Sequence, residues 1–175
     1  MTTTNSSVFK VLRVVSAMLF VGLFFQTATI LYSSLQSLFA DANAAKDLYR
    51  GLSLYELLSA NKAYYINAVS LLVLVNGLKT YVLFLVMRVF KIFNPAKPFE
   101  SAMSELFMKI SYFSLGTGVL ALIANGYFKW LLKNGTVVPV NWGSEEILVF
   151  AGVIYILALV FQKGTELQTE NDLTV

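Results

Sequence analysis

Four long apolar stretches dominate this sequence, at about residues 11–35, 63–90, 106–130 and 146–162. A helix needs about 20 apolar residues to cross a bilayer, and inside hydrocarbon every backbone amide needs a partner within the chain. The stretches therefore predict an all-α fold, an integral membrane four-helix bundle. Residues 1–175 form a single four-pass transmembrane domain in this interpretation, and residues 163–175 form its tail.

The amino-acid composition limits the classes of function that this chain can have. The chain is 57% hydrophobic and 13% charged, whereas soluble domains are about 45–50% apolar. It contains no cysteine and no histidine, which excludes disulfides, thiol or imidazole catalysis, and zinc sites with nitrogen or sulfur ligands. Acidic residues form no paired arrangement suited to acid–base chemistry. We expect a non-enzymatic protein with no cofactor and no metal, and with no basic block for direct nucleic-acid binding.

The first stretch has a rival interpretation as a cleaved secretory signal peptide, because "FADANAA" offers small residues at a cleavage spacing. The apolar run is longer than the 7–15 residues typical of a signal peptide, so an uncleaved helix is favoured. Lys and Arg are somewhat more frequent near the ends predicted to be inner, and Tyr64, Tyr127 and Trp130 fall near the outer ends. These patterns predict an N-in/C-in topology, with both termini cytoplasmic.

The first outer loop carries an apolar stripe. Leu48, Leu52, Tyr55 and Leu58 recur at steps of three and four residues, which predicts a short amphipathic helix, although Gly51 counts against it. In the second outer loop, Ser144 is suited to begin the fourth helix.

Lys79 is a charge inside a predicted span, and Asn76 shares its helix face. A lysine near the bilayer centre costs about 2.5–3.5 kcal/mol on insertion scales, and we expect no Asp or Glu within the spans to pair with it. Either an anion or lipid headgroup binds there, or side chains and carbonyls satisfy the lysine for packing alone. Gln26, Thr29, Asn76 and Lys79 thus form a candidate intramembrane polar site, suited to a small transporter or a lipid- or anion-binding protein.

Two stripes of small and weakly polar residues predict helix–helix contacts, because helices in lipid associate through close backbone approach and hydrogen bonds. A polar transport path is the alternative for the first stripe. A homo-oligomer also stays open, because Gly116 and Gly118 would serve a second copy as well as the fold. The stripes are Gly22, Gln26, Thr29 and Ser33, and then Ser114, Gly118, Ala121 and Asn125.

The end of the chain has two interpretations. Lys163-Gly164 is a reasonable helix end, with Thr165 and Gln168 in a capping-box pattern for a further turn. Alternatively the fourth helix continues through "TELQTEN", and only "DLTV" is extended.

The inner loop "NPAKPF" and the terminal "KGTELQTENDLTV" resemble the bacterial domain-of-unknown-function family 2975. That resemblance implies a multi-pass protein of the bacterial cytoplasmic (inner) membrane with no assigned activity. Members are often encoded beside a small helix-turn-helix regulator, which implies such a regulator as a partner beside the lipid bilayer. The matching residues, which are the candidate partner-binding residues, are Lys97, Pro98, Phe99, Gly164, Glu166, Leu167, Gln168, Glu170, Asn171, Asp172, Leu173, Thr174 and Val175.

The resemblance suggests a role for the acidic tail. If both termini are inside, the tail and the Pro98-Phe99 loop share the cytoplasmic face, where they would bind or sequester the regulator. The alternative is a tail that folds back over its own bundle, with its carboxylates paired to Arg88 and Lys91.

Overall fold

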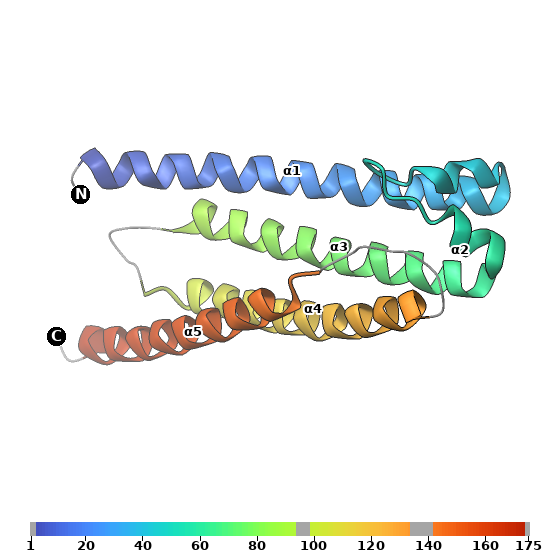
Figure 1. Cartoon of the computed structure of the whole chain (residues 1–175). Helices are drawn as coiled ribbons and strands as arrows, with labels where there is room; N and C mark the ends of the chain where they lie inside the picture. The colour runs from blue at the N-terminus through green and yellow to red at the C-terminus, as the bar shows by residue number, and fades with distance from the viewer. Residues whose placement is uncertain (1–2, 94–98, 134–141, 174–175) are drawn as a thin grey trace.

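Four long helices form the protein. The computed structural model describes residues 3–93, 99–133 and 142–173, with side chains for residues 7–93, 99–133 and 142–170. The long helices are α1 (Thr3–Phe39), α3 (Lys62–Ile92), α4 (Ser101–Lys133) and α5 (Ser144–Leu173). Two short helices, η1 (Ala42–Lys46) and α2 (Tyr55–Ala60), join α1 to α3. α1 begins and α5 ends at one end of the molecule (Figure 1), here named the inner end after the predicted topology, and the opposite end is the outer end.

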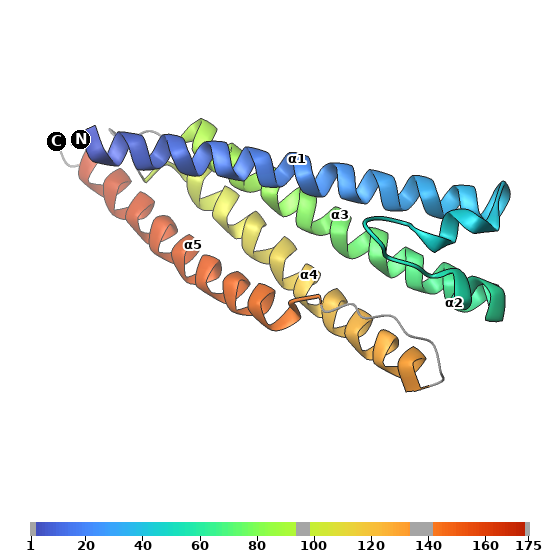
Figure 2. The same ribbon diagram turned by 45° about the horizontal axis from the view of Figure 1, so that its top comes forward.

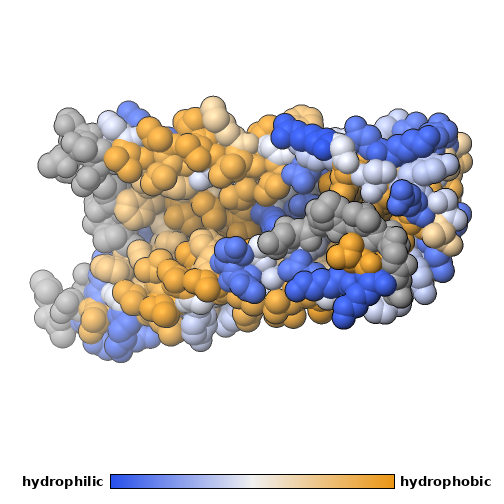
Figure 3. All heavy atoms as spheres, viewed as in Figure 1, coloured by the Kyte–Doolittle hydropathy of each residue, from blue (hydrophilic) through white to orange (hydrophobic). Residues whose placement is uncertain are grey.

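Each long helix contains a segment long and apolar enough to cross a membrane, with mean hydropathy between 1.6 and 2.1. Hydrophobic residues cover much of the visible helix surface, and hydrophilic residues gather at the end where α2 lies (Figure 3). The predicted all-α four-helix membrane bundle is therefore confirmed, and the chain is a multi-pass membrane protein. The helices run beyond the predicted spans at both ends, and α5 continues to Leu173 instead of leaving the helix near residue 162.

The bundle is open along one side. Neighbouring helices contact one another in the order α1, α3, α4, α5, and the contact between α4 and α5 is the most extensive. Within the described residues, the backbones of α1 and α5 do not approach each other. The two views place these helices on opposite edges (Figures 1 and 2).

The α4–α5 contact follows small residues spaced by seven. The Ser111 hydroxyl donates to the Ala151 carbonyl at 3.0 Å, and the Ser104 hydroxyl donates to the Ala158 carbonyl at 3.4 Å. Both serines and both alanines are buried. Small side chains permit backbone approach close enough for such bonds, and the seven-residue spacing keeps the contact on one face of each helix.

Gly118 continues this seam toward the outer end. A Cβ atom at Gly118 would lie 2.6 Å from Cδ2 and 2.7 Å from Cγ of Leu148, so the leucine occupies the space that a side chain would need. Ala121 of the same stripe is fully buried, and Asn125 contacts Ser144. The predicted contact face of the third span is confirmed.

α5 begins alongside the last third of α4 and not at its end. The Asn125 amide donates to the Ser144 hydroxyl at 3.0 Å, and α4 continues from Asn125 to Lys133 for about another 12 Å at 1.5 Å per residue. Figure 2 shows the outer end of α4 extending past the start of α5. Trp142, two residues before α5 starts, is accordingly buried.

α1 packs against α3 through a different face from the predicted one. Gly22 and Thr29 are exposed, whereas Ile30 and Ser37 are buried. The Ser37 hydroxyl is hydrogen-bonded to the buried Tyr65 hydroxyl of α3. The first stripe was therefore assigned to the wrong face of the helix: the contact face comprises Thr27, Ile30, Ser34 and Ser37.

The outer loop forms a compact cap, defined here as residues 42–60. The predicted helix is present only as α2, because Arg50 and Gly51 adopt positive φ and make a turn upstream of it. The Asp47 carboxylate accepts a hydrogen bond from the Gly51 backbone amide at 2.9 Å, which stabilises this turn. Leu48 of the apolar stripe is fully buried in the cap even though it lies outside a helix.

Replacing Gly118 tests the seam. We expect Gly118→Val to reduce the free energy of unfolding in mild detergent by about 1–3 kcal/mol, because the added methyl groups overlap Leu148. Gly116→Val is the matched control, since nothing lies within 4 Å of a Cβ atom there. Thermal unfolding followed by circular dichroism measures both. Equal melting temperatures for the two variants would contradict the seam.

Candidate functional site

Phe99 joins the inner loop to α5. Its ring lies 5.3 Å from the Phe161 ring, and its carbonyl accepts the Thr165 hydroxyl at 3.2 Å. A Cβ atom at Gly164 would lie 2.4 Å from the Phe99 ring carbon Cδ1. Glycine in a helix costs about 1 kcal/mol relative to alanine, and here its lack of a side chain makes room for the Phe99 ring. Gly164 is therefore a contact position inside α5 and not a helix end.

A polar groove of about 380 Å³ lies beside this junction, at the inner end. One wall comes from the segment that enters α4, and the other from the last turns of α5. The groove is lined by Phe99, Glu100, Ser101, Ala102, Thr165, Gln168 and Thr169. The structure thus brings together the inner loop and the tail, two segments far apart in the sequence.

Beyond Gly164 the chain stays helical through Leu173, so the continuing-helix interpretation is correct. Lys163 and Glu166 form an exposed ion pair at 2.9 Å within α5. Leu167, next to Glu166, is 52% exposed. Glu166 therefore pairs within its own helix, and the described part of the tail continues α5 instead of folding back.

The other predicted partner-binding residues divide into three groups. Gln168 lines the groove, and Glu170 is exposed on the same helix. Asn171, Asp172 and Leu173 belong to α5, but their side chains lie outside the described set. Lys97, Pro98, Thr174 and Val175 lie outside the described residues.

Lys79 contacts the segment that precedes α5. Its ammonium donates to the Trp142 carbonyl at 2.9 Å and lies 5.8 Å from the centre of the Trp142 ring. Both contacts help to offset the cost of a cation in the membrane. The hydrogen bond to the Trp142 carbonyl supports the interpretation in which protein carbonyls satisfy Lys79.

The start of α5 carries a connected set of polar groups. The Trp142 amide donates to the Asn125 side-chain carbonyl at 3.4 Å, and the Asn125 amide donates to Ser144. Gly143, at φ +60°, provides the backbone turn between them. Trp142 is 4% exposed, and its ring nitrogen has no hydrogen-bond partner in the described part of the chain.

α5 begins at Ser144, so Glu145 and Glu146 occupy its first turn, beside Asn125 of α4. Neither glutamate forms an ion pair with Lys79 in the part of the chain that the structure describes. Both glutamates are exposed on the molecular surface.

The structure does not assemble the predicted intramembrane polar set. Asn76 is buried and donates to the Leu72 carbonyl of its own helix at 3.0 Å. Thr29 is exposed, and Gln26 is partly buried on α1. The contacts of Lys79 are instead with the carbonyl and the ring of Trp142, just before α5. The pattern of apolar residues does not predict these contacts. Counting in steps of seven from the Ser111–Ala151 bond puts Ser144 opposite Gly118, so this spacing alone does not reveal the contact with Asn125.

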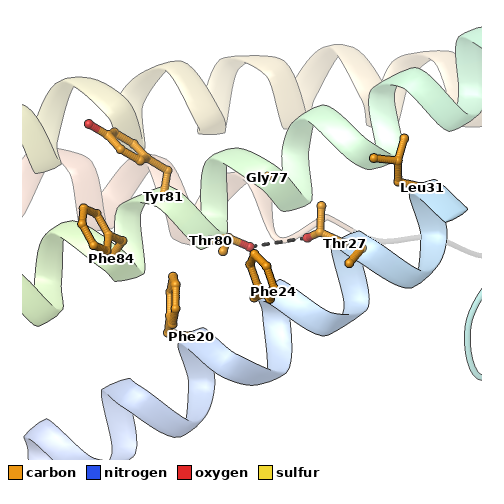
Figure 4. Close-up of a pocket in the computed structure, with 9 residues that line it drawn as sticks. Phe20, Phe24, Thr27, Leu31, Gly77, Thr80, Tyr81 and Phe84 are labelled. Atoms are coloured by element: carbon orange, nitrogen blue, oxygen red, sulfur yellow. Dashed lines mark hydrogen bonds between the residues drawn. The ribbon is translucent and has the colours of Figure 1, made fainter.

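An apolar groove of about 460 Å³ separates α1 from α3 on the lipid-facing side (Figure 4). At its base, the Thr27 and Thr80 hydroxyls lie 3.4 Å apart and share a hydrogen bond. Both also have a carbonyl partner in their own helix, at Leu23 and Asn76. The groove therefore offers aromatic walls and no free charge, as expected of a surface covered by lipid tails. Its lining is Phe20, Phe24, Thr27, Ala28, Leu31, Gly77, Thr80, Tyr81 and Phe84.

The junction at Phe99 can be tested by cross-linking, because the natural chain has no cysteine. We expect an Ala102→Cys/Gln168→Cys pair to be joined efficiently by a short bifunctional maleimide, since both positions line one groove. Adding Gly164→Val should lower the yield several-fold, because its side chain displaces Phe99. Gly152→Val, on an open face of α5, should leave the yield unchanged. A yield that Gly164→Val does not alter would contradict the junction.

Comparison with known proteins identifies a family for most of the chain. A family model described as protein of unknown function (DUF2975) matches residues 48–175, from the outer cap to the end of the sequence. Searches of curated proteins and of solved structures each found no match. Because the matched region includes α2, α3, α4 and α5, the chain belongs to the DUF2975 family of proteins of unknown function.

Proposed function

We propose that this chain is a non-enzymatic protein of the bacterial cytoplasmic membrane that binds a soluble partner at its inner end. The supporting observation is the junction of Phe99 with Gly164 and Thr165, which builds one groove from two distant segments. Gly164 leaves room for the Phe99 ring and so holds the tail helix against the inner loop. The loop thereby positions the tail helix and presents it to the inner side.

The tail indicates the chemistry of the partner. From Thr165 to Leu173 the helix extends about 12 Å and carries exposed Glu166 and Glu170. Leu167 adds an exposed apolar side chain between the two carboxylates. Acidic side chains around an apolar anchor favour a partner with a basic surface that surrounds a shallow apolar pocket.

A small helix-turn-helix regulator, the partner that the family resemblance implies, fits this chemistry. Such proteins carry Lys and Arg on the surface that neutralises DNA phosphates. A carboxylate-bearing helix bound to that surface would compete with DNA and hold the regulator at the membrane. We therefore propose sequestration of a regulator as the activity of the inner end.

The partner proposal is tested with a purified small helix-turn-helix regulator, of the kind that the family resemblance implies, and the full-length membrane protein in nanodiscs. Glu166→Gln/Glu170→Gln should weaken binding about tenfold or more at low salt and flatten its salt dependence, because charge pairing is lost. Glu56→Gln, an exposed glutamate of α2 at the outer end, is the matched control. Absence of saturable binding to the natural chain would reject this partner.

Topology is tested separately with single cysteines. Gln168→Cys at the inner end and Asn43→Cys in η1 should react with a membrane-impermeant maleimide from opposite sides of sealed vesicles. Position 168 should react only in inside-out vesicles. Labelling of position 168 from the periplasmic side would overturn the proposed orientation and, with it, a cytoplasmic partner.

A further inference from the structure

A cavity of about 210 Å³ lies between the four long helices. It shares no lining residue with the polar groove at the inner end. Every long helix contributes to its wall, and the cavity is open on one side. Its lining is mostly apolar, with Lys79 of α3 and Ser114 and Thr117 of α4 as the polar exceptions. The lining residues are Leu23, Lys79, Val82, Leu83, Ser114, Thr117, Ile147 and Phe150.

Ser114 is the first sign of a ligand. The residue is 1% exposed, and its hydroxyl has no hydrogen-bond partner within the described part of the chain. Most buried hydroxyls are hydrogen-bonded, and an unpaired one costs about 1–3 kcal/mol. A serine or threonine in a membrane helix commonly donates a hydrogen bond to a carbonyl one turn earlier in its own helix. Thr117, one turn after Ser114, does so to the Phe113 carbonyl. Ser114 instead lines the cavity with unused hydrogen-bonding capacity.

Lys79 is the second sign. An ammonium has three donors, and the Trp142 carbonyl accepts one of them. Glu146 does not line the cavity and forms no ion pair with Lys79 among the described residues. No carboxylate is among the described residues around this space. A cation and an unpaired hydroxyl therefore border one small cavity, and both can donate to a negatively charged oxygen.

The open side of the bundle supplies a route for a ligand from the lipid. Leu23 lies on α1 and Phe150 on α5, the two helices whose described backbones do not approach each other. Figure 3 shows the surface hollowed between these helices toward the inner half, with hydrophobic residues on both sides. An apolar chain can lie along this hollow while its polar end reaches Lys79.

We propose that this cavity binds the carboxylate of a single-chain fatty acid, held by Lys79 and Ser114, with its acyl chain leaving between α1 and α5. The cavity holds roughly seven groups of the size of a water molecule, at about 30 Å³ each, so it admits a carboxylate and the first methylenes. A space of this volume suits one acyl chain better than the two chains of a phospholipid. Leu23, Ile147 and Phe150 provide the apolar contacts for the chain.

The test uses the full chain in phosphatidylcholine nanodiscs and a sixteen-carbon fatty acid that carries a diazirine. We expect saturable photo-cross-linking to α1 and α5 near Leu23 and Phe150. Lys79→Met should weaken binding about tenfold or more, because a charge-assisted hydrogen bond is lost, and Ser114→Ala about fivefold. Lys109→Met, an exposed lysine on α4 outside the cavity, is the matched control and should bind as the natural chain does.

Ser114→Ala keeps the test decisive if Lys79→Met fails to fold. Removal of an unpaired buried hydroxyl should leave the ligand-free melting temperature unchanged or higher, so weaker binding by this variant reports the ligand contact. Unlabelled fatty acid should compete with the probe, whereas its methyl ester, lysophosphatidylcholine and inorganic phosphate should compete at least tenfold less well. Equal competition by the ester, protection by phosphate alone, or binding that neither variant alters would overturn the proposal.

Discussion

The close approach of α4 and α5 determines where the other parts of the molecule lie. Without bulk water there is no hydrophobic force between these helices, so small residues and serine-to-carbonyl hydrogen bonds hold them together. The bonds from Ser104 and Ser111 to Ala158 and Ala151 set one register for the pair. The same helix contact extends from Ser144 beside Asn125 at one end to Thr165 beside Phe99 at the other. The intramembrane polar groups and the inner-end groove are therefore two ends of the same helix contact.

Much of the fold could be predicted from the sequence, because the membrane permits little besides helices for long apolar runs. The contact face of α4 could also be predicted, since small residues on it recur at helical spacing. The face of α1 could not, because Gly22 and Thr29 resemble a contact stripe while Thr27, Ile30 and Ser37 make the contacts. The spacing of polar residues along one helix does not show which of its faces a neighbouring helix will contact. The partner of Lys79 was missed for a related reason: it is a backbone carbonyl, which no side-chain pattern reveals.

Three glycines of similar appearance have different roles in this chain. Gly118 and Gly164 are sites where another side chain, Leu148 or Phe99, occupies the volume of a missing Cβ atom. Gly116 has open space around it. Neither Gly118 nor Gly164 ends a helix, although the second follows a lysine in a pattern typical of helix termini. In a membrane bundle, the role of a glycine therefore depends on the side chains that face it from outside its helix as much as on its position in its own helix.

The start of α5 part-way along α4 has a consequence for the surrounding bilayer. Glu145 and Glu146 are exposed in that first turn, and ionised carboxylates in contact with acyl tails are costly. Water and phospholipid polar groups must therefore reach deeper beside α5 than beside α1, whose surface is apolar over most of its length. Such a difference requires the leaflet to thin on one flank of the protein. The molecule should accordingly be sensitive to membrane thickness, with longer acyl chains penalising the α5 flank most.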